Sequence, residues 1–278
     1  MRIRLLLLAL GLGALALPAG ACDLSTAHRG KAVADYVEDL KPCMAAMPAG
    51  FEHDSAMEAE FLRLVNSERI SAGLKPLKLR PELVDVARIH SLDMAFNNFF
   101  GHESPDGRMP HQRIAAFDRS AIVLASAENV AMVEIVRGRW NLERKAVDRL
   151  HSNLMNSPPH KKNILNPDME WAAMGVVRTK SGVWITQVFM ELGGTLDAPL
   201  PVRLSPGEAL DARAVLHGWT FDSFEAKRAH GDYLRLDGTI PAGLSGDFDL
   251  AAKGMRPADR PGFTNIIHLP GPAATVGG

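Results

Sequence analysis

The sequence lacks the features that mark several classes of protein. Its 31 basic residues are balanced by 32 acidic residues, and no basic run occurs. A nucleic-acid partner or a polybasic membrane patch is therefore not expected. No His-Glu-x-x-His helix and no Gly-x-Ser-x-Gly elbow is present, which removes the two most specific short signals for a metallohydrolase and a serine hydrolase. At 278 residues and 46% hydrophobic composition, the chain has enough apolar material for one or two domains.

Only the N-terminus holds a long apolar run. Arg2 and Arg4 precede an apolar stretch from Leu5 to Leu17, and Ala19-Gly20-Ala21 follows it. A basic start, an apolar middle and a small-x-small end are typical of a signal peptide. We therefore predict a signal peptide at residues 1–21. The mature chain should have no transmembrane helix and lie outside the cytoplasm, in the periplasm or secreted.

Cysteine is scarce, and both copies lie near the predicted cleavage site. Cys22 would be the first mature residue, and Cys43 is the only other cysteine. A lipoprotein peptidase would leave Cys22 lipidated, although Ala19 stands where lipoprotein signals usually have leucine. An ordinary signal peptidase would leave Cys22 free to pair with Cys43, which an exported protein permits. Both interpretations stay open on the sequence.

Hydrophobic periodicity divides the mature chain into segments. Residues 22–50 predict a helical prologue or linker, and residues 51–193 a helix-rich α+β domain that ends in a strand hairpin. Residues 193–201 predict a linker, because glycine and proline are frequent there. Residues 202–270 contain six short alternating runs, which predict a small sandwich-like all-β accessory domain without a chemical site. Residues 271–278 predict a disordered tail.

Three short islands in the middle of the chain carry chemically useful side chains. They are Gly101-His102-Glu103-Ser104-Pro105-Asp106-Gly107, Ala127-Glu128-Asn129-Val130-Ala131 and Asn156-Ser157-Pro158-Pro159-His160-Lys161-Lys162-Asn163-Ile164-Leu165. Two imidazoles and one carboxylate could hold a divalent metal or act as an acid–base cluster. We predict that His102, Glu128 and His160 converge on one cleft. His90 falls on the apolar stripe of a predicted helix, which favours a hydrogen-bonded core histidine.

Several motifs in one order resemble the CAP superfamily of cysteine-rich secretory, antigen 5 and pathogenesis-related 1 proteins, in its bacterial secreted branch. Besides the three islands, they are Leu64-Val65-Asn66-Ser67-Glu68-Arg69, Ala87-x-x-His90-Ser91-x-Asp93-Met94, Met174-Gly175-Val176 and Trp184-Ile185-Thr186-Gln187-Val188-Phe189. The resemblance covers roughly residues 54–192. It implies a three-layer α-β-α sandwich, with further short strands between residues 74 and 135.

The resemblance also implies a cleft with two histidines and two acidic residues. His102, Glu128 and His160 match three of the four, and Asn153 stands where the second acid is expected. The implied cofactor is zinc, held by His102, Glu128 and His160.

Three functions follow as alternatives. The first is an exported module whose cleft binds a metal and an envelope or extracellular ligand, which could be a lipid, a polymer or a protein. The second is an interaction protein with a vestigial cleft that binds partners through its C-terminal β domain. The third is a metal-assisted hydrolase with Glu128 as the base.

Overall fold

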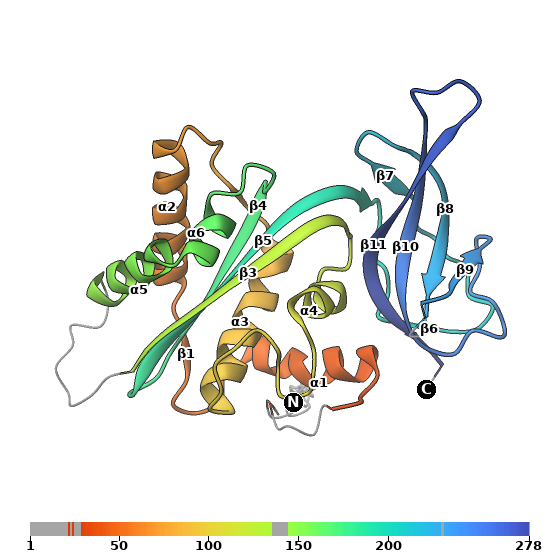
Figure 1. The fold of residues 1–278 in the computed structure, drawn as a ribbon. Coiled ribbons are helices and arrows are strands. Elements are labelled where there is room, and N and C mark those ends of the chain that lie inside the picture. Colours follow the sequence, from red (N-terminus) through yellow and green to blue (C-terminus); the bar gives the residue numbers. More distant parts are fainter. Residues whose placement is uncertain (1–21, 23, 25–28, 135–143, 229–230, 278) are drawn as a thin grey trace, which may run out of the picture.

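The computed structural model describes residues 22, 24, 29–134, 144–228 and 231–277. The predicted signal peptide lies outside this part. Figure 1 shows an α/β body that is built around one sheet and, beside it, a second body made of strands. Within the described ranges, no helix is both long and apolar enough to cross a membrane.

The α/β body contains both helices and strands. Its helices are α1 (Val33–Ala45), α2 (Ser55–Ser71), α3 (Pro81–Phe96), α4 (Pro110–Phe117), α5 (Arg144–Asn156) and α6 (Pro158–Ile164). Its strands are β1 (Glu52–His53), β2 (Lys78–Leu79), β3 (Ala121–Glu134), β4 (Trp171–Arg178) and β5 (Gly182–Leu196). The predicted helix that carries His90 and the predicted strand hairpin agree with α3 and β4–β5. The extra strand material predicted between residues 74 and 135 includes one long strand, β3, rather than only short ones.

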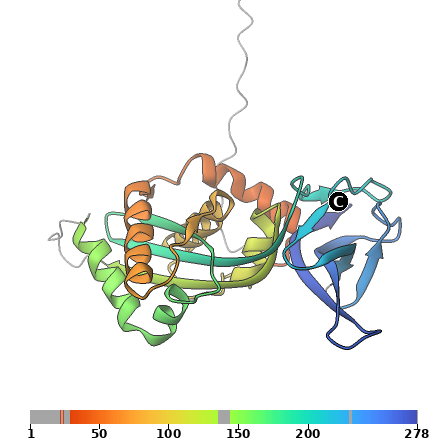
Figure 2. The ribbon, with the colours of Figure 1, turned by 90° about the horizontal axis from the view of Figure 1, so that it is seen from above.

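The sheet lies between two layers of helices, as the predicted α-β-α sandwich requires. Its order is β1-β4-β5-β3, so β3 is an edge strand. Side chains alternate between the two faces of each strand. On β4, Met174 and Val176 face the cluster formed with α2, α5 and α6, whereas Ala173 faces α3 and α4. Figure 2 shows the helices on either side of the sheet.

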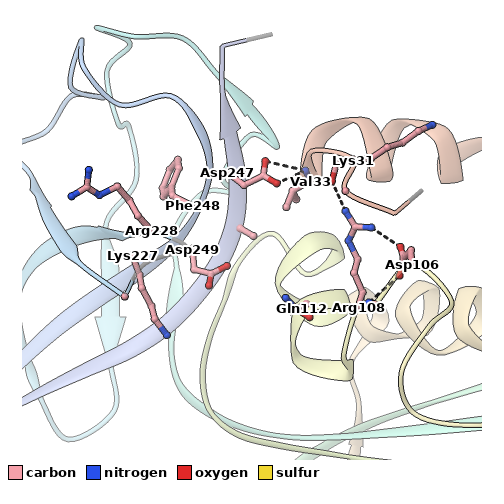
Figure 3. Close-up of a pocket in the computed structure, with 14 residues that line it drawn as sticks. Lys31, Val33, Asp106, Arg108, Gln112, Lys227, Arg228, Asp247, Phe248 and Asp249 are labelled. Carbon is pink, nitrogen blue, oxygen red and sulfur yellow. Dashed lines mark hydrogen bonds and ion pairs between the residues drawn. The ribbon is translucent and has the colours of Figure 1, made fainter. Parts of the chain in front are cut away.

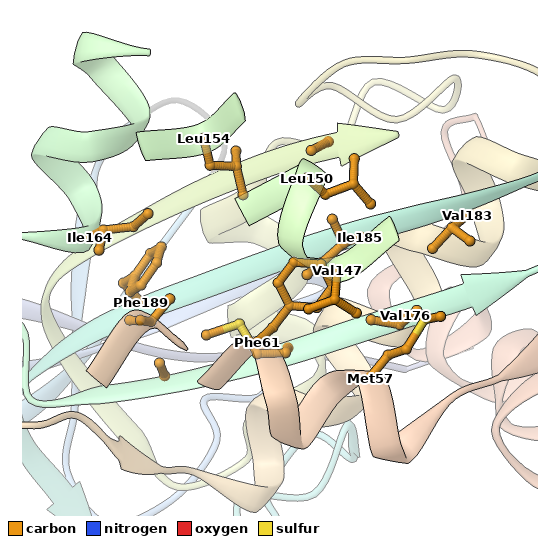
Figure 4. Close-up of a cluster of buried hydrophobic side chains, with 14 of the residues drawn as sticks. Met57, Phe61, Val147, Leu150, Leu154, Ile164, Val176, Val183, Ile185 and Phe189 are labelled. Atoms are coloured by element: carbon orange, nitrogen blue, oxygen red, sulfur yellow. The ribbon is translucent and has the colours of Figure 1, made fainter. Parts of the chain in front are cut away.

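The hydrophobic cluster between the sheet and helices α2, α5 and α6 is built largely from the apolar stripes of α2 and α5. Phe61 of α2 and Phe189 of β5 are fully buried at its centre, beside Leu150 and Leu154 of α5 (Figure 4). Burying a side chain of this size contributes about 1.5–3 kcal/mol. Asp54 caps α2 by accepting a hydrogen bond from the Met57 N–H at 2.9 Å.

The prologue packs on the α/β body instead of linking it to something else. Leu40 and Tyr36 of α1 are buried with Leu92 of α3. Cys22 and Cys43 form a disulfide, which leaves no Cys22 thiol for a lipid. The predicted boundary at residue 50 therefore does not separate two structural units, because α1 completes the layer next to α3.

The second body is one five-stranded sheet with the order β6-β11-β10-β8-β9, not a sandwich of two sheets. Its strands are β6 (Arg203–Leu204), β8 (Thr220–Lys227), β9 (Tyr233–Leu236), β10 (Gly246–Pro257) and β11 (Thr264–Val276). β7 (Ala214–Leu216) pairs with β5 of the first sheet instead. Residues from the end of the first sheet, among them Ile122 and Leu196, fill the core of the second.

Two predictions at the ends of this body are wrong. The predicted linker begins inside β5. Glycine at position 194 lets β7 pack closely on β5, because a Cβ on Gly194 would lie 2.3 Å from the Val215 carbonyl oxygen. The predicted disordered tail is the end of β11. There Ala274 and Val276 are buried, because their side chains lie in the hydrophobic core of the second sheet.

Gly175 is the position where α3 packs most closely on the sheet. A Cβ at this residue would lie 2.2 Å from the backbone carbonyl carbon of Ala87, which cannot move without shifting α3. We expect Gly175→Ala to lower the free energy of unfolding by about 3 kcal/mol, at the upper end of overpacking costs. Urea unfolding measures this. Gly101→Ala, whose Cβ would meet nothing within 4 Å, is the matched control. Equal midpoints for both variants would contradict the packing argument.

Candidate functional site

The predicted site residues gather around the edge strand β3. Glu128 lies on β3, His102 on the loop between α3 and α4, and His160 on α6. Consecutive residues of a strand point to opposite faces of the sheet. Glu128 therefore faces the α3–α4 layer, and Asn129 faces the layer of α5 and α6.

Glu128 is a buried carboxylate with two partners. Its side chain is 2% exposed. His102 Nδ1–H donates to one carboxylate oxygen at 2.9 Å, and the guanidinium of Arg113 donates to the other at 2.8 Å. Burial alone would raise the pKa of Glu128, but the hydrogen bond from His102 and the charge of Arg113 outweigh it and lower the pKa. The carboxylate thus stays ionised, and its charge is balanced within the protein.

Arg113 is the residue that sequence reasoning missed. It lies on α4, its side chain is 1% exposed, and it also donates to Ser104 Oγ at 3.2 Å and to the Arg108 carbonyl at 2.8 Å. These bonds tie Glu128 to the loop that carries His102. Only its place beside Ile114 in a short helix hinted at burial, and a lone arginine next to an apolar residue is usually exposed.

His90 is a core histidine, as predicted. It is fully buried, and its Nε2–H donates to the Gly101 carbonyl at 2.9 Å. The same nitrogen lies 3.7 Å from a Glu128 oxygen. Burial first, and the charge of Arg113 second, lower the pKa of His90 to about 4. His90 is therefore neutral at physiological pH, and its hydrogen bond to the Gly101 carbonyl holds the backbone next to His102.

His160 lies in the opposite layer, on α6. Its backbone carbonyl accepts a hydrogen bond from Asn129 Nδ2 at 3.1 Å, and Asn163 Nδ2 donates to the Glu128 carbonyl at 3.3 Å. Burial and the nearby charge of His102 lower the pKa of His160. The charge of His102 therefore affects the pKa of His160. Gln187 is fully buried in the sheet, where its Oε1 accepts from Asn129 at 3.1 Å.

The three predicted metal ligands do not form a ready metal site. Within the described residues, no group of three His, Cys, Asp or Glu side chains could hold a metal ion. Each oxygen of Glu128 already has a partner, and the carboxylate faces away from the layer that carries His160. Asn153, at the position of the missing acid, is exposed on α5. The zinc site implied by the resemblance therefore does not fit this arrangement.

Removing Arg113 should show how much the protein depends on the balanced charge. Arg113→Met would leave Glu128 buried without its cationic partner, which typically costs about 3–5 kcal/mol. The exposed ion pair of Arg63 and Glu60 on α2 gives a matched control, and Arg63→Met should change the free energy of unfolding little, because solvent screens this pair. Urea unfolding at pH 7 compares them, and similar losses for the two variants would contradict a buried, ionised Glu128.

His90 should make the stability of the protein depend on pH. The folded protein keeps His90 neutral down to about pH 4, whereas the unfolded chain binds a proton below 6.5. Stability should therefore fall as the pH drops from 6.5 towards 4, by up to about 1.4 kcal/mol per pH unit from this group. His90→Gln should have a shallower slope in that window. Unfolding free energies measured across it test this, and parallel slopes would contradict it.

The sequence matches known proteins mainly across this domain. Residues 62–189 match the model of the cysteine-rich secretory protein family, named CAP. Uncharacterized protein YkwD of Bacillus subtilis (strain 168) is 31% identical over 167 residues, covering 60% of this chain and 57% of YkwD. The match thus spans little more than half the length of that relative.

Two solved structures that are similar to this chain are named as extracellular or outer surface proteins. An extracellular protein containing a SCP domain from Bacillus anthracis str. Ames has a TM-score of 0.41 at 26% identity, over 50% of this chain and 41% of that chain. An outer surface protein from Borrelia burgdorferi has a TM-score of 0.41 at 19% identity, over 48% of this chain and 91% of that chain. Residues 62–189 carry the family match, so this part of the chain is similar to the cysteine-rich secretory proteins of the CAP family.

Proposed function

We propose that this protein is an extracytoplasmic binding module whose cleft, lined by His102, Glu128 and His160, takes an envelope or extracellular ligand. The observation that carries the proposal is the arrangement around Glu128. A fully balanced, buried carboxylate holds a histidine whose side chain is 45% exposed. Such a group presents its free ring nitrogen to a ligand at little cost, because its orientation is already fixed.

The same arrangement favours binding over hydrolysis. A general base needs a pKa near the working pH. The pKa of Glu128 is lowered instead, and both of its oxygens are engaged. Ser104 is buried and bonded to Arg113, so it is not offered as a nucleophile.

The rim of the cleft suggests the chemistry of the ligand. Lys161 and Lys162, which follow His160 in the sequence, are exposed on α6, and Phe100, two residues before His102, is 53% exposed. Cationic and imidazole groups beside an exposed ring favour a ligand with an acidic group next to an apolar or sugar-like part. Acidic lipids and acidic envelope polymers both have this character.

An export route supports the proposed location. The N-terminal sequence has the form of a signal peptide. The Cys22–Cys43 disulfide suits an oxidising compartment. These two features are independent of each other, and both favour a place outside the cytoplasm.

Imidazole NMR signals of the full mature chain test the cleft directly. We add vesicles of anionic phospholipid, a soluble acidic polysaccharide or zinc chloride in separate titrations. At least one of the two organic probes should shift the signals of both His102 and His160. The signal of His217, which bonds to the Leu192 carbonyl at 3.0 Å, should stay unchanged. The His102→Ala/His160→Ala variant should lose affinity for that probe by about tenfold or more, as expected when two ligand contacts are removed.

Zinc gives the opposite expectation. To bind zinc with all three predicted ligands, Glu128 would have to give up its ion pair with Arg113, so we expect no saturable shift at one equivalent. Saturation by zinc in the wild type alone would establish the metal site. The absence of shifts with both organic probes would contradict the proposed binding module.

A further inference from the structure

The loop that carries His102 connects α3 and α4, and residues of the prologue also contact it. Arg108, at the end of this loop, forms an ion pair with Asp106 and donates to the Lys31 carbonyl of the prologue at 2.8 Å. Its guanidinium also lies 3.9 Å above the ring of Tyr36 on α1. Arg108 therefore joins the loop both to Lys31, which precedes α1, and to Tyr36 on α1.

The other contacts of the prologue reach the same loop. Arg29 donates to the Pro105 carbonyl at 3.3 Å. Asn97, where α3 ends and the loop begins, donates to the Leu24 carbonyl at 2.6 Å. The prologue thus touches the loop at its beginning, its middle and its end, and the Cys22–Cys43 disulfide holds the prologue itself together.

The C-terminal sheet fixes the other end of the prologue. Both carboxylate oxygens of Asp247 on β10 accept from the Val33 N–H at the start of α1, at 3.0 and 3.1 Å. Thr275 on β11 accepts from the Ala34 N–H at 3.0 Å. α1 has no side-chain cap of its own. Two residues more than 200 positions away therefore supply the cap that this helix needs.

The junction between these parts is open rather than filled. A cavity of about 740 Å³ lies there, with Lys31, Asp106 and Arg108 on one wall and Asp247 and Asp249 on the other. Figure 3 shows the bonds from Asp247 to Val33 and from Lys31 through Arg108 to Asp106 along its edge. At this cavity, these polar bonds contribute to the connection between the prologue, the loop and the C-terminal sheet.

We propose that Arg108 is a positioning residue for the cleft, and that it holds the His102 loop by way of the prologue and the C-terminal sheet. The inference rests on the proposed function in one respect, namely that His102 is the cleft residue that needs a fixed position. It assigns the two regions outside the family match a role in the cleft.

Hydrogen exchange of the full mature chain, without any ligand, tests this inference. In Arg108→Gln, the amides of Ser104 and Gly107, which donate to the carbonyls of Arg108 and Ser104, should exchange about tenfold faster or more, as expected when charge-assisted hydrogen bonds are lost. The amides of β4 and β5 should be unaffected. The NMR signal of the His102 Nδ1–H that is bound to Glu128 should also broaden or disappear.

Arg203→Gln is the matched control. Arg203 on β6 also contacts α1, through Asp35 at 2.7 Å and Glu38 at 3.3 Å, but neither of these ion pairs involves the loop. This variant should keep wild-type exchange at the two loop amides and the His102 signal. A loss in both variants would mean that any disturbance of α1 loosens the loop, and the assignment to Arg108 would be overturned.

Two further samples cover the case in which Arg108→Gln does not fold. Arg108→Lys keeps a charge beside Asp106 but cannot pair, bond and stack at once. Wild type with the disulfide reduced loosens the prologue without any substitution. Both should speed exchange at the two loop amides in the same direction. Wild-type exchange in both samples would overturn the proposal, whatever the ligand titrations give.

Discussion

The buried ion pair between Glu128 and Arg113 is the constraint around which the site is built. A carboxylate this deep in the protein is stable only with a cationic partner and a full set of hydrogen bonds. Arg113 meets that need from α4, and its other bonds reach Ser104 and the Arg108 carbonyl. The position of α4, the path of the loop before it and the orientation of His102 therefore depend on one charge.

The edge position of β3 decides how the predicted site residues are arranged. Glu128 and Asn129 are neighbours in the chain, yet they organise opposite layers. Glu128 gathers His102, Arg113 and His90, and Asn129 holds the backbone of α6 beneath His160. The two histidines can approach each other only around the open edge of the strand. This geometry suits a ligand that spans both layers and separates the carboxylate from the second histidine.

The regions on either side of the family match are part of the same structure. The prologue completes the layer beside α3, and the core of the C-terminal sheet includes Ile122 and Leu196 from the first sheet. Asp247 caps α1 from the far end of the chain. The cleft loop is thus linked to residues that local sequence patterns would place in separate domains.

The sequence by itself determined the local elements: the periodicity at Pro81–Phe96, the proline start of α4 and the alternation in β4 and β5 each depend on neighbours in the chain. Its motifs, which occur in a fixed order, also predicted the similarity to the CAP family model at residues 62–189. Only the tertiary structure decided that Arg113 balances Glu128, that the Ala273–Val276 segment is a core strand, and that Arg108 joins the loop to the prologue. Those contacts join residues distant in sequence, and charge pairing and burial act through space, so no local pattern encodes them.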